Sequence, residues 1–434
     1  MRIYRLGEIS EKVKKRILLR AELDVGRAVE IVKPILKDVE KNGDKAVLKY
    51  IKKFDRVDLR ANELKVRKSE IDEAYRVIDR KLLKAIEHAA RNIRKFHERQ
   101  KSKEYFIEIE KGVVVGRRVI PLRTAGLYVP KGKAVYPSVM LMLGIPASVA
   151  GVKEIVACTS AQSNGELDPA TLVASDIAGV HKVFRIGGAQ AIAAMAYGTG
   201  TVPRVDVIAG PGSAYVSAAQ RLVKLNTRVD FPAGPSEGMV MADRFADPRL
   251  VAADVLSEAE HGPESSGVLV TDSMGLALVV RKEFKRMLER LPEQRQRYVE
   301  TNMKLYSCII VTKSLKEAID FVNDYAPEHL VINTRNPKGV VRKIENAGTI
   351  CLGENTPITA GNFICGPNAI LPTGRYARHY AGVSVDTFVK KPTVEYLSKQ
   401  GLKGVSEDLL KLCEFEGFPA HSNAVKVRLN AEND

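Results

Sequence analysis

The stretch that decides the fold is KVFRIGGAQAIAAMAYGTGTVPRVDVIAGPG, residues 182–212. It holds two short apolar runs, 182–188 and 205–212, each ending in a glycine turn, and an alanine-rich run with helical composition between them. A strand, a helix and a second strand in this order form a βαβ unit, in which the two strands are parallel. The stretch therefore predicts an α/β fold.

Runs of the same kind continue on both sides of this stretch, separated by segments of helical composition. The series upstream consists of 112–122 (GVVVGRRVIPL) and 153–160 (KEIVACTS), and the series downstream consists of 238–243 (GMVMAD), 266–272 (SGVLVTD), 307–313 (SCIIVTK), 329–335 (HLVINTR) and 348–354 (GTICLGE). Two such series predict two Rossmann-like parallel-sheet domains with a cleft between them.

The two ends of the chain differ from this pattern. Residues 21–54 and 71–100 are highly charged with helical spacing of apolar positions, and Gly43-Asp44 breaks the first region. The tail contains a predicted helix at 405–417. We therefore expect small helical N- and C-terminal pieces around the two domains. The predicted domains are 1–21 (N-terminal piece), 22–120 with 237–383 (first Rossmann-like domain), 121–236 (second Rossmann-like domain) and 384–434 (C-terminal tail).

Composition narrows the class of partner. The chain has 434 residues, of which 45% are hydrophobic, so it can bury a large core. The net charge of +16 is diffuse, since basic residues alternate with acidic ones, as in 66–99. With no Trp and 6% aromatic residues, the chain offers little for stacking on bases. We expect a small-molecule partner and no nucleic acid.

Location and redox state also follow from the sequence. The charged start offers no signal peptide, which predicts the cytoplasm. The longest uncharged stretch, 134–152, is interrupted by prolines and glycines, so we interpret it as buried core and expect no membrane partner. The five cysteines form no CxxC pair, which indicates neither a disulfide framework nor a thiolate zinc site.

Three motifs carry candidate chemistry, and each has a structural alternative. The strand that runs into Gly210-Pro211-Gly212 and an alanine-rich helix is either a phosphate-binding turn or a plain tight turn. Glu258 and His261, spaced i, i+3 before Gly262-Pro263, are either metal ligands on one helix face or an exposed pair. Glu328 and His329 follow an amphipathic helix, and they either address two atoms of one substrate or form a solvated turn.

As an ordered set, these pieces resemble the histidinol dehydrogenase family over nearly the whole chain. The segments that carry the resemblance are 125–130 (AGLYVP), 185–199 (RIGGAQAIAAMAYGT), 208–216 (IAGPGSAYV), 230–238 (DFPAGPSEG), 257–265 (SEAEHGPES), 323–330 (NDYAPEHL), 361–373 and 416–428 (EGFPAHSNAVKVR). The resemblance implies oxidation of L-histidinol to L-histidine through the aldehyde by two NAD, with one zinc per site. It also implies a homodimer whose tail reaches the partner's site.

The resemblance also implies residue roles. Glu328 and His329 match the catalytic pair. The other implied roles are NAD contact (Tyr128, Gln190, Ser213), zinc ligation (Glu258, His261, Asn362, His421) and substrate contact (Ser236, Glu258, His261, His329, Asn362, Glu416, His421).

Four positions depart from the family pattern. Glu258 stands where the family has Gln, Asn362 where it has Asp, Ser213 where Asn is usual and Ala369 where His is usual. The first two changes compensate, so the ligand set keeps two imidazoles, one carboxamide and one carboxylate. Loss of the histidine at Ala369 leaves open a paralogue with the same NAD chemistry on another polar or amino alcohol. A further alternative is a ligand-binding or structural subunit without catalysis.

Overall fold

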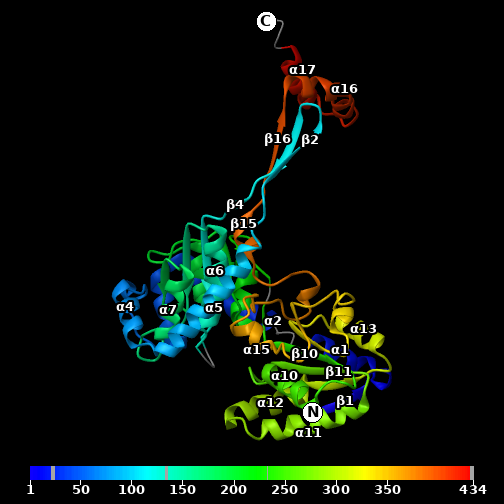
Figure 1. Cartoon of the computed structure of the whole chain (residues 1–434). Helices are drawn as coiled ribbons and strands as arrows, with labels where there is room; N and C mark the ends of the chain where they lie inside the picture. Colours follow the sequence, from blue (N-terminus) through cyan, green and yellow to red (C-terminus); the bar gives the residue numbers. More distant parts are fainter. Residues whose placement is uncertain (21–24, 132–134, 232, 431–434) are drawn as a thin grey trace. The chain divides into compact units, whose positions relative to one another are not determined.

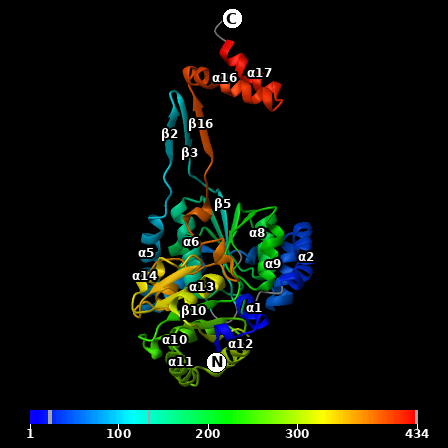
Figure 2. The same ribbon diagram turned by 90° about the vertical axis from the view of Figure 1, so that its right-hand side faces the viewer.

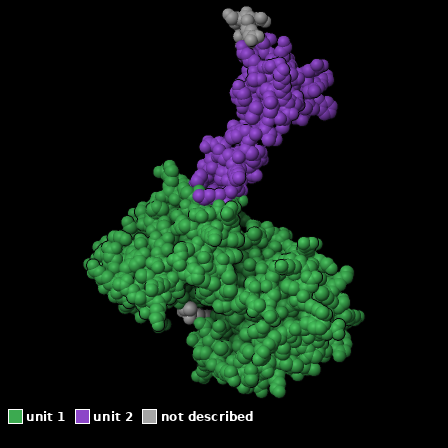
Figure 3. All heavy atoms as spheres, viewed as in Figure 1, with its two compact units in different colours: residues 1–100, 122–388 green, residues 101–121, 389–434 purple. Residues whose placement is uncertain are grey.

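The structure is a computed structural model that describes residues 1–20, 25–131, 135–231 and 233–430. The chain forms two compact units, one of Met1–Gln100 and Leu122–Phe388 and one of Lys101–Pro121 and Val389–Asp434 (Figure 3). Unit 1 contains two parallel sheets with helices on both faces (Figure 1). The predicted α/β class with two parallel sheets is confirmed.

The larger sheet of unit 1 has six strands. Their order is β1 (Arg2–Arg5), β12 (Cys308–Val311), β11 (Ser266–Thr271), β10 (Glu237–Ala242), β13 (His329–Asn333) and β14 (Thr349–Leu352). Successive side chains point to opposite faces of a strand. Accordingly, Val240 packs in one core cluster, which includes residues of α10 (Pro248–Ala259), α11 (Met274–Leu288) and α12 (Glu293–Leu305). Met239 packs in the other, which includes residues of α1 (Glu11–Leu19), α13 (Leu315–Tyr325) and α14 (Pro337–Val341).

The smaller sheet of unit 1 has five strands. Their order is β7 (Lys182–Phe184), β6 (Glu154–Cys158), β5 (Thr124–Tyr128), β8 (Val207–Ala209) and β9 (Arg228–Val229). The helices on one face are α4 (Lys68–Val77), α5 (Arg80–Glu98), α6 (Pro137–Ala150) and α7 (Pro169–Ala178). Those on the other are α2 (Val25–Asn42), α3 (Asp44–Tyr50), α8 (Gly188–Tyr197) and α9 (Ala214–Val223), and Figure 2 shows α2 beside α8 and α9.

The uncharged stretch predicted to be buried core forms α6, whose residues 140–147 are buried on the five-stranded sheet. The first residue of the uncharged stretch, Ala134, lies outside the described residues. Among the described residues, no helix is both long and apolar enough to cross a membrane.

The charged N-terminal region is helical as predicted, although residues 21–24 lie outside the described part. Gly43, at a φ of +52°, separates α2 from α3 at the predicted break. The second predicted helix is divided at Asp79, whose side chain caps α5 by accepting a hydrogen bond from Leu82 N. Helices α2 to α5 pack on the five-stranded sheet, which departs from the predicted grouping of 22–120 with 237–383. The domain boundaries themselves stay a prediction.

Unit 2 is built on a three-stranded antiparallel sheet. Its order is β16 (Thr393–Leu397), β3 (Val113–Arg117) and β2 (Tyr105–Glu110), followed by α16 (Lys399–Phe415) and α17 (Pro419–Asn430). A short pair, β4 (Ile120–Pro121) and β15 (Val389–Lys390), is also antiparallel. The predicted tail helix is confirmed by α16. The prediction that 112–122 opens the parallel series is wrong, because a valine-rich run specifies a strand but not the direction of its neighbours.

Candidate active site

The candidate site lies between edges of the two sheets of unit 1. Strands β10 and β13 begin at Glu237 and His329, so these residues mark the amino edge of the six-stranded sheet. Strands β5 and β8 end at Tyr128 and Ala209, on the carboxyl edge of the five-stranded sheet. Loops from both edges line one cavity of about 610 Å³. Its lining includes Lys131, Ser213, Ser236, Glu258, His261, Glu328, His329, Asn362 and Ala369.

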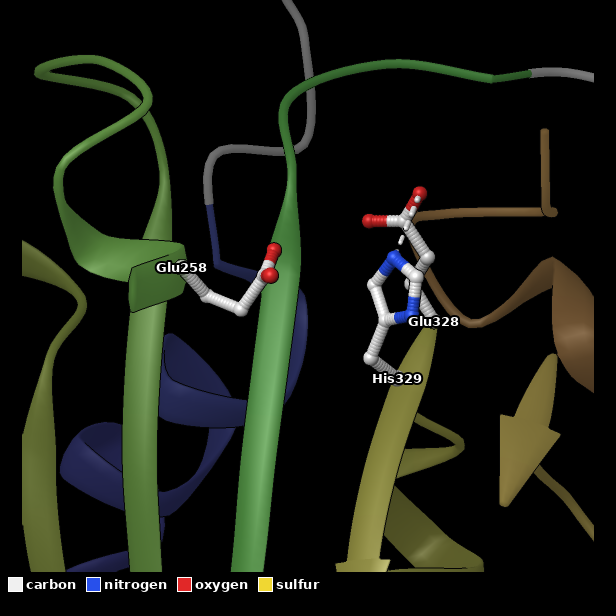
Figure 4. A group of neighbouring side chains, drawn as sticks. All are labelled: Glu258, Glu328 and His329. Carbon is white, nitrogen blue, oxygen red and sulfur yellow. Dashed lines mark ion pairs between the residues drawn. The ribbon is translucent and has the colours of Figure 1, made fainter. Parts of the chain in front are cut away.

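Glu328 and His329 enter this cavity from the short connection between α13 and β13. Ala326 ends the helix in the left-handed conformation, with φ +51° and ψ +66°. The next residues are fixed by hydrogen bonds from Gly348 N to Pro327 O (2.9 Å) and from Thr349 N to Glu328 O (2.9 Å). Both predicted side chains are buried, and His329 Nε2 lies 3.8 Å from Glu328 Oε1 (Figure 4). The burial of both side chains excludes the alternative interpretation, in which Glu328 and His329 form a solvent-exposed turn.

Glu258 approaches the same pair from the last turn of α10. Its side chain crosses Gly238 so closely that a Cβ there would lie 2.3 Å from Glu258 Cγ, so only glycine leaves room for it. Gly238 is in register with His329 on the neighbouring strand. One ligand atom from each of Glu258, Glu328 and His329 lies within 4.8 Å of the other two (Figure 4).

His261 follows the helix rather than ending it. Helix α10 ends at Ala259, so the helix stops before it reaches His261, which the spacing placed on the same helical face as Glu258. His261 N still donates to Glu258 O at 3.3 Å. The ring atom Nδ1 lies 3.8 Å from Glu258 Oε2, and the side chain is 39% exposed at the cavity. The turn closed by this backbone hydrogen bond thus keeps Glu258 and His261, the two predicted metal ligands, close together.

The surroundings shift the protonation of the central pair in opposite directions. Burial, with added repulsion from Glu258 and Glu237, raises the pKa of Glu328 well above its usual range. Burial also lowers the pKa of His329, which favours the neutral imidazole. Perturbed groups of this kind in one cavity are typical of sites of acid–base chemistry.

Several polar atoms in the cavity lack a protein partner. Among the residues that the structure describes, Glu258 Oε2, His329 Nδ1 and Asn362 Oδ1 are buried without a hydrogen-bond partner. Buried polar atoms are nearly always satisfied, so unpaired ones on residues that line a cavity indicate room for a ligand. Two of the three belong to the predicted metal set, and the third is the nitrogen of a predicted catalytic residue.

The carboxyl edge of the five-stranded sheet has the features of an anion site. Gly210 has a φ of +133°, and a Cβ there would lie 2.1 Å from Tyr128 O. Ser213 precedes α9 and lines the cavity. Tyr128 accepts a hydrogen bond from Gly188 N at 3.1 Å, and Gln190 is buried with its Oε1 unpartnered among the described residues. Two helices, α8 and α9, begin at this edge, and helix N-termini favour phosphate.

The remaining predicted residues divide between the units. Ser236 and Ala369 line the cavity, and Ala369 N lies 3.3 Å from Met142 Sδ. Glu416 and His421 belong to unit 2, where Glu416 follows α16 and His421 lies on α17. Both are exposed.

Sequence reasoning missed one residue that contacts the pair directly. Glu237 N donates a 2.8 Å hydrogen bond to Glu328 Oε2, while Glu237 Oε1 accepts from Gly374 N at 2.7 Å. Its own side chain is buried. The available signal was a carboxylate at the first position of an otherwise apolar strand, next to Ser236 in DFPAGPSEG.

Asp254, one turn before Glu258 in α10, provides a test of the electrostatics. Burial and the nearby Glu258 raise the pKa of Asp254 to about 6. Because an unfolded Asp titrates near pH 3.9, the folded protein retains a proton that the unfolded chain loses. The free energy of unfolding should fall as pH rises from about 4 to about 6, by up to about 3 kcal/mol, and then level off.

We therefore expect Asp254→Asn to remove this decrease in the free energy of unfolding. At pH values above 7, the variant should have a higher thermal midpoint than the starting protein. Thermal unfolding of chelator-treated protein between pH 4 and pH 8 measures it. An unchanged pH slope in the variant would show that Asp254 titrates normally.

Comparison with known proteins gives a consistent result. The model of the family described as histidinol dehydrogenase matches residues 18–429. The histidinol dehydrogenases of Synechocystis sp. and Methanococcus maripaludis are each 44% identical to this chain, over 99% of it and 99% and 100% of their own lengths. The crystal structure of histidinol dehydrogenase from Elizabethkingia anophelis superposes with a TM-score of 0.92 at 37% identity, covering 100% of this chain and 99% of the other.

Proposed function

The chain belongs to the histidinol dehydrogenase family, and we propose that it performs the reaction of that family in the cavity of unit 1, with Glu328 and His329 as the catalytic residues. It is an NAD-dependent oxidoreductase that acts on the CH–OH group of histidinol, in histidine biosynthesis. The observation that supports the location best is the buried Glu328–His329 pair, which meets Glu258 at the wall of the cavity.

Each catalytic residue has one proton to move. His329, neutral because burial lowers its pKa, accepts the hydroxyl proton of L-histidinol as the carbinol carbon loses a hydride. Glu328 then accepts a proton from the water that adds to the aldehyde, and the hydrated carbon loses a second hydride to give the carboxylic acid. NAD, when bound, is the hydride acceptor. The raised pKa makes the ionised carboxylate of Glu328 a stronger base than that of an exposed glutamate.

The proposed NAD contacts are Tyr128, Gln190 and Ser213. The N-termini of α8 and α9 suit the pyrophosphate, and the glycine at 210 lets the backbone come close. The unpartnered Gln190 Oε1 is an acceptor for a ribose hydroxyl or a nicotinamide amide.

The proposed zinc ligands are Glu258, His261, Asn362 and His421. Carboxylate oxygen and imidazole nitrogen are ordinary zinc donors, and the buried unpartnered oxygens of Glu258 and Asn362 fit this use. The C-terminal end of α10, which carries Glu258, also favours a cation. A zinc ion held by these residues would orient the substrate and would stabilise negative charge on its oxygen.

The exchanged ligands are tested by a double-mutant cycle. Glu258→Gln leaves no anionic ligand and should weaken zinc binding at least about 10-fold, whereas Asn362→Asp adds a second carboxylate and should tighten it. The double variant, which restores the family arrangement, should bind zinc about as well as the starting protein.

Calorimetry with zinc on metal-stripped protein measures all four affinities. Asn362→Asp should raise zinc affinity more in the Glu258→Gln background than in the starting protein, because there it supplies the only carboxylate, and this non-additivity is the expected result. Additive effects, or no zinc bound by the starting protein, would contradict the proposal that both residues face one ion.

We also propose a homodimer in which the tail of one subunit completes the site of the other. Unit 2 exposes large apolar side chains, among them Phe415 (89%), Tyr396 (62%) and Leu412 (60%), as expected for a surface covered by a partner. Its Glu416 and His421 are exposed and have the side chains needed for the substrate and the metal. Mixing inactive His329→Ala and His421→Ala subunits should restore about a quarter of the activity, because half the dimers are mixed and one of their two sites is intact.

The substrate is tested with a panel of polar and amino alcohols, with NADH formation as the signal. We expect L-histidinol to be preferred by orders of magnitude. Ala369 and Ser213 favour the paralogue as second candidate, and turnover of another alcohol in preference to histidinol would select it. NAD binding without turnover of any alcohol would select a non-catalytic subunit. The biosynthetic role also leads us to propose a cytoplasmic location.

A further inference from the structure

Arg20 is a buried charge behind the candidate site that the proposed chemistry does not use. It follows α1, and its side chain is only 2% exposed. Its Nη2 atom forms an ion pair with Glu237 Oε2 at 2.8 Å and donates to Ala326 O at 3.2 Å. The guanidinium carbon lies 3.5 Å from the centre of the Tyr325 ring.

These partners are connected to Glu328 in two ways. Glu237 donates its backbone N–H to Glu328 Oε2 at 2.8 Å, so the position of Glu237 decides where the carboxylate of Glu328 is held. Tyr325 and Ala326 are the third and second residues before Glu328, and they begin the connection that carries it. One guanidinium group therefore contacts both Glu237, which donates to the Glu328 carboxylate, and the backbone two residues before Glu328.

The backbone at this point requires support. Ala326 has a positive φ of 51°, which costs of order 1 kcal/mol for a residue with a Cβ. The hydrogen bond from Arg20 satisfies its carbonyl oxygen in this conformation. A buried ion pair alone is a poor source of stability, because desolvation of the charges offsets their attraction. The geometry points to positioning of Glu328, rather than stability, as the role of the Arg20–Glu237 ion pair.

We propose that Arg20 is a positioning residue, which holds Glu237 and the 325–328 connection so that Glu328 faces the reacting carbon. The proposal rests on the role of Glu328 proposed above. Because Glu328 acts on the aldehyde, loss of Arg20 should slow the aldehyde step more than the alcohol step.

The test compares Arg20→Met and Arg20→Lys with Arg16→Ala, which removes a neighbouring exposed arginine on α1 as a control. We expect Arg20→Met to lower kcat for histidinal about 10- to 100-fold, with KM for histidinal and for NAD within about threefold of the starting protein. Lysine keeps the charge but lacks the planar fork, so Arg20→Lys should show an intermediate loss. Arg16→Ala should be unaffected, because Arg16 is exposed.

Equal slowing of the alcohol and aldehyde steps, or a fall in thermal midpoint with unchanged kcat in Arg20→Lys, would overturn the proposal. If the starting protein oxidises no histidinol, the proposed function fails instead. The positioning role is then judged by a crystal structure of Arg20→Lys, or of Arg20→Met where it folds. A Glu328 carboxylate that stays on Glu237 N in the variant would overturn it, and a displaced carboxylate would support it.

Discussion

We expect His329→Ala to lower kcat for histidinol oxidation by about 10³-fold, within the range of 10² to 10⁴ typical of general bases. His329 is buried at the first position of β13, with Nδ1 unpartnered among the described residues. No other imidazole lines the cavity in the described part of the chain except His261, which is a proposed metal ligand. NADH formation at saturating histidinol and NAD measures the loss.

His88→Ala is the matched control, because His88 is exposed on α5 and should leave kcat unchanged. NAD affinity of His329→Ala, measured by calorimetry, should stay close to that of the starting protein. Full turnover by His329→Ala on any accepted alcohol would remove His329 from the mechanism.

We expect Glu328→Gln to abolish the second oxidation, lowering kcat for histidinal by about 10²- to 10⁴-fold. The glutamine keeps an oxygen for the hydrogen bond from Glu237 N but cannot accept a proton from water. Single-turnover measurements starting from histidinol and from histidinal separate the two steps. The alcohol step should be affected much less than the aldehyde step.

The same variant should be more stable than the starting protein. Burial and neighbouring carboxylates raise the pKa of Glu328, so the free energy of unfolding falls as pH rises above the pKa of Glu in the unfolded chain, and this loss is present at pH 8. A neutral glutamine removes this cost, and the thermal midpoint at pH 8 should rise. Glu354→Gln, at an exposed position, serves as control. Unimpaired histidinal oxidation by Glu328→Gln would show that another group activates the water.

The parallel sheets could be predicted because their strands are buried on both faces and appear as continuous apolar runs between helices. The run 182–212 contains β7, α8 and β8 as expected. The antiparallel pairing of 113–117 with β16 could not be predicted, because β16 comes from the other end of the chain. Strand β1 was missed for another reason. It is an edge strand of only four residues beside β12, which is too short to show a periodicity of its own.

The site was predictable where neighbouring residues carry the chemistry. Glu328 and His329 are adjacent in sequence and remain adjacent in space. Their proximity to Glu258 depends on which strands pair, and nothing in the spacing of SEAEHGPES contains that information. The contact of Arg20 with Ala326 joins residues 306 positions apart, and a lone arginine after a helix gives no signal for it.

The most direct test of the account is the balance of the complete reaction. Purified protein, supplied with L-histidinol, zinc and excess NAD, should form two NADH for each histidinol consumed, with L-histidine as the product identified by mass spectrometry. The account is contradicted if no NADH forms, or if one NADH forms per histidinol and the aldehyde accumulates.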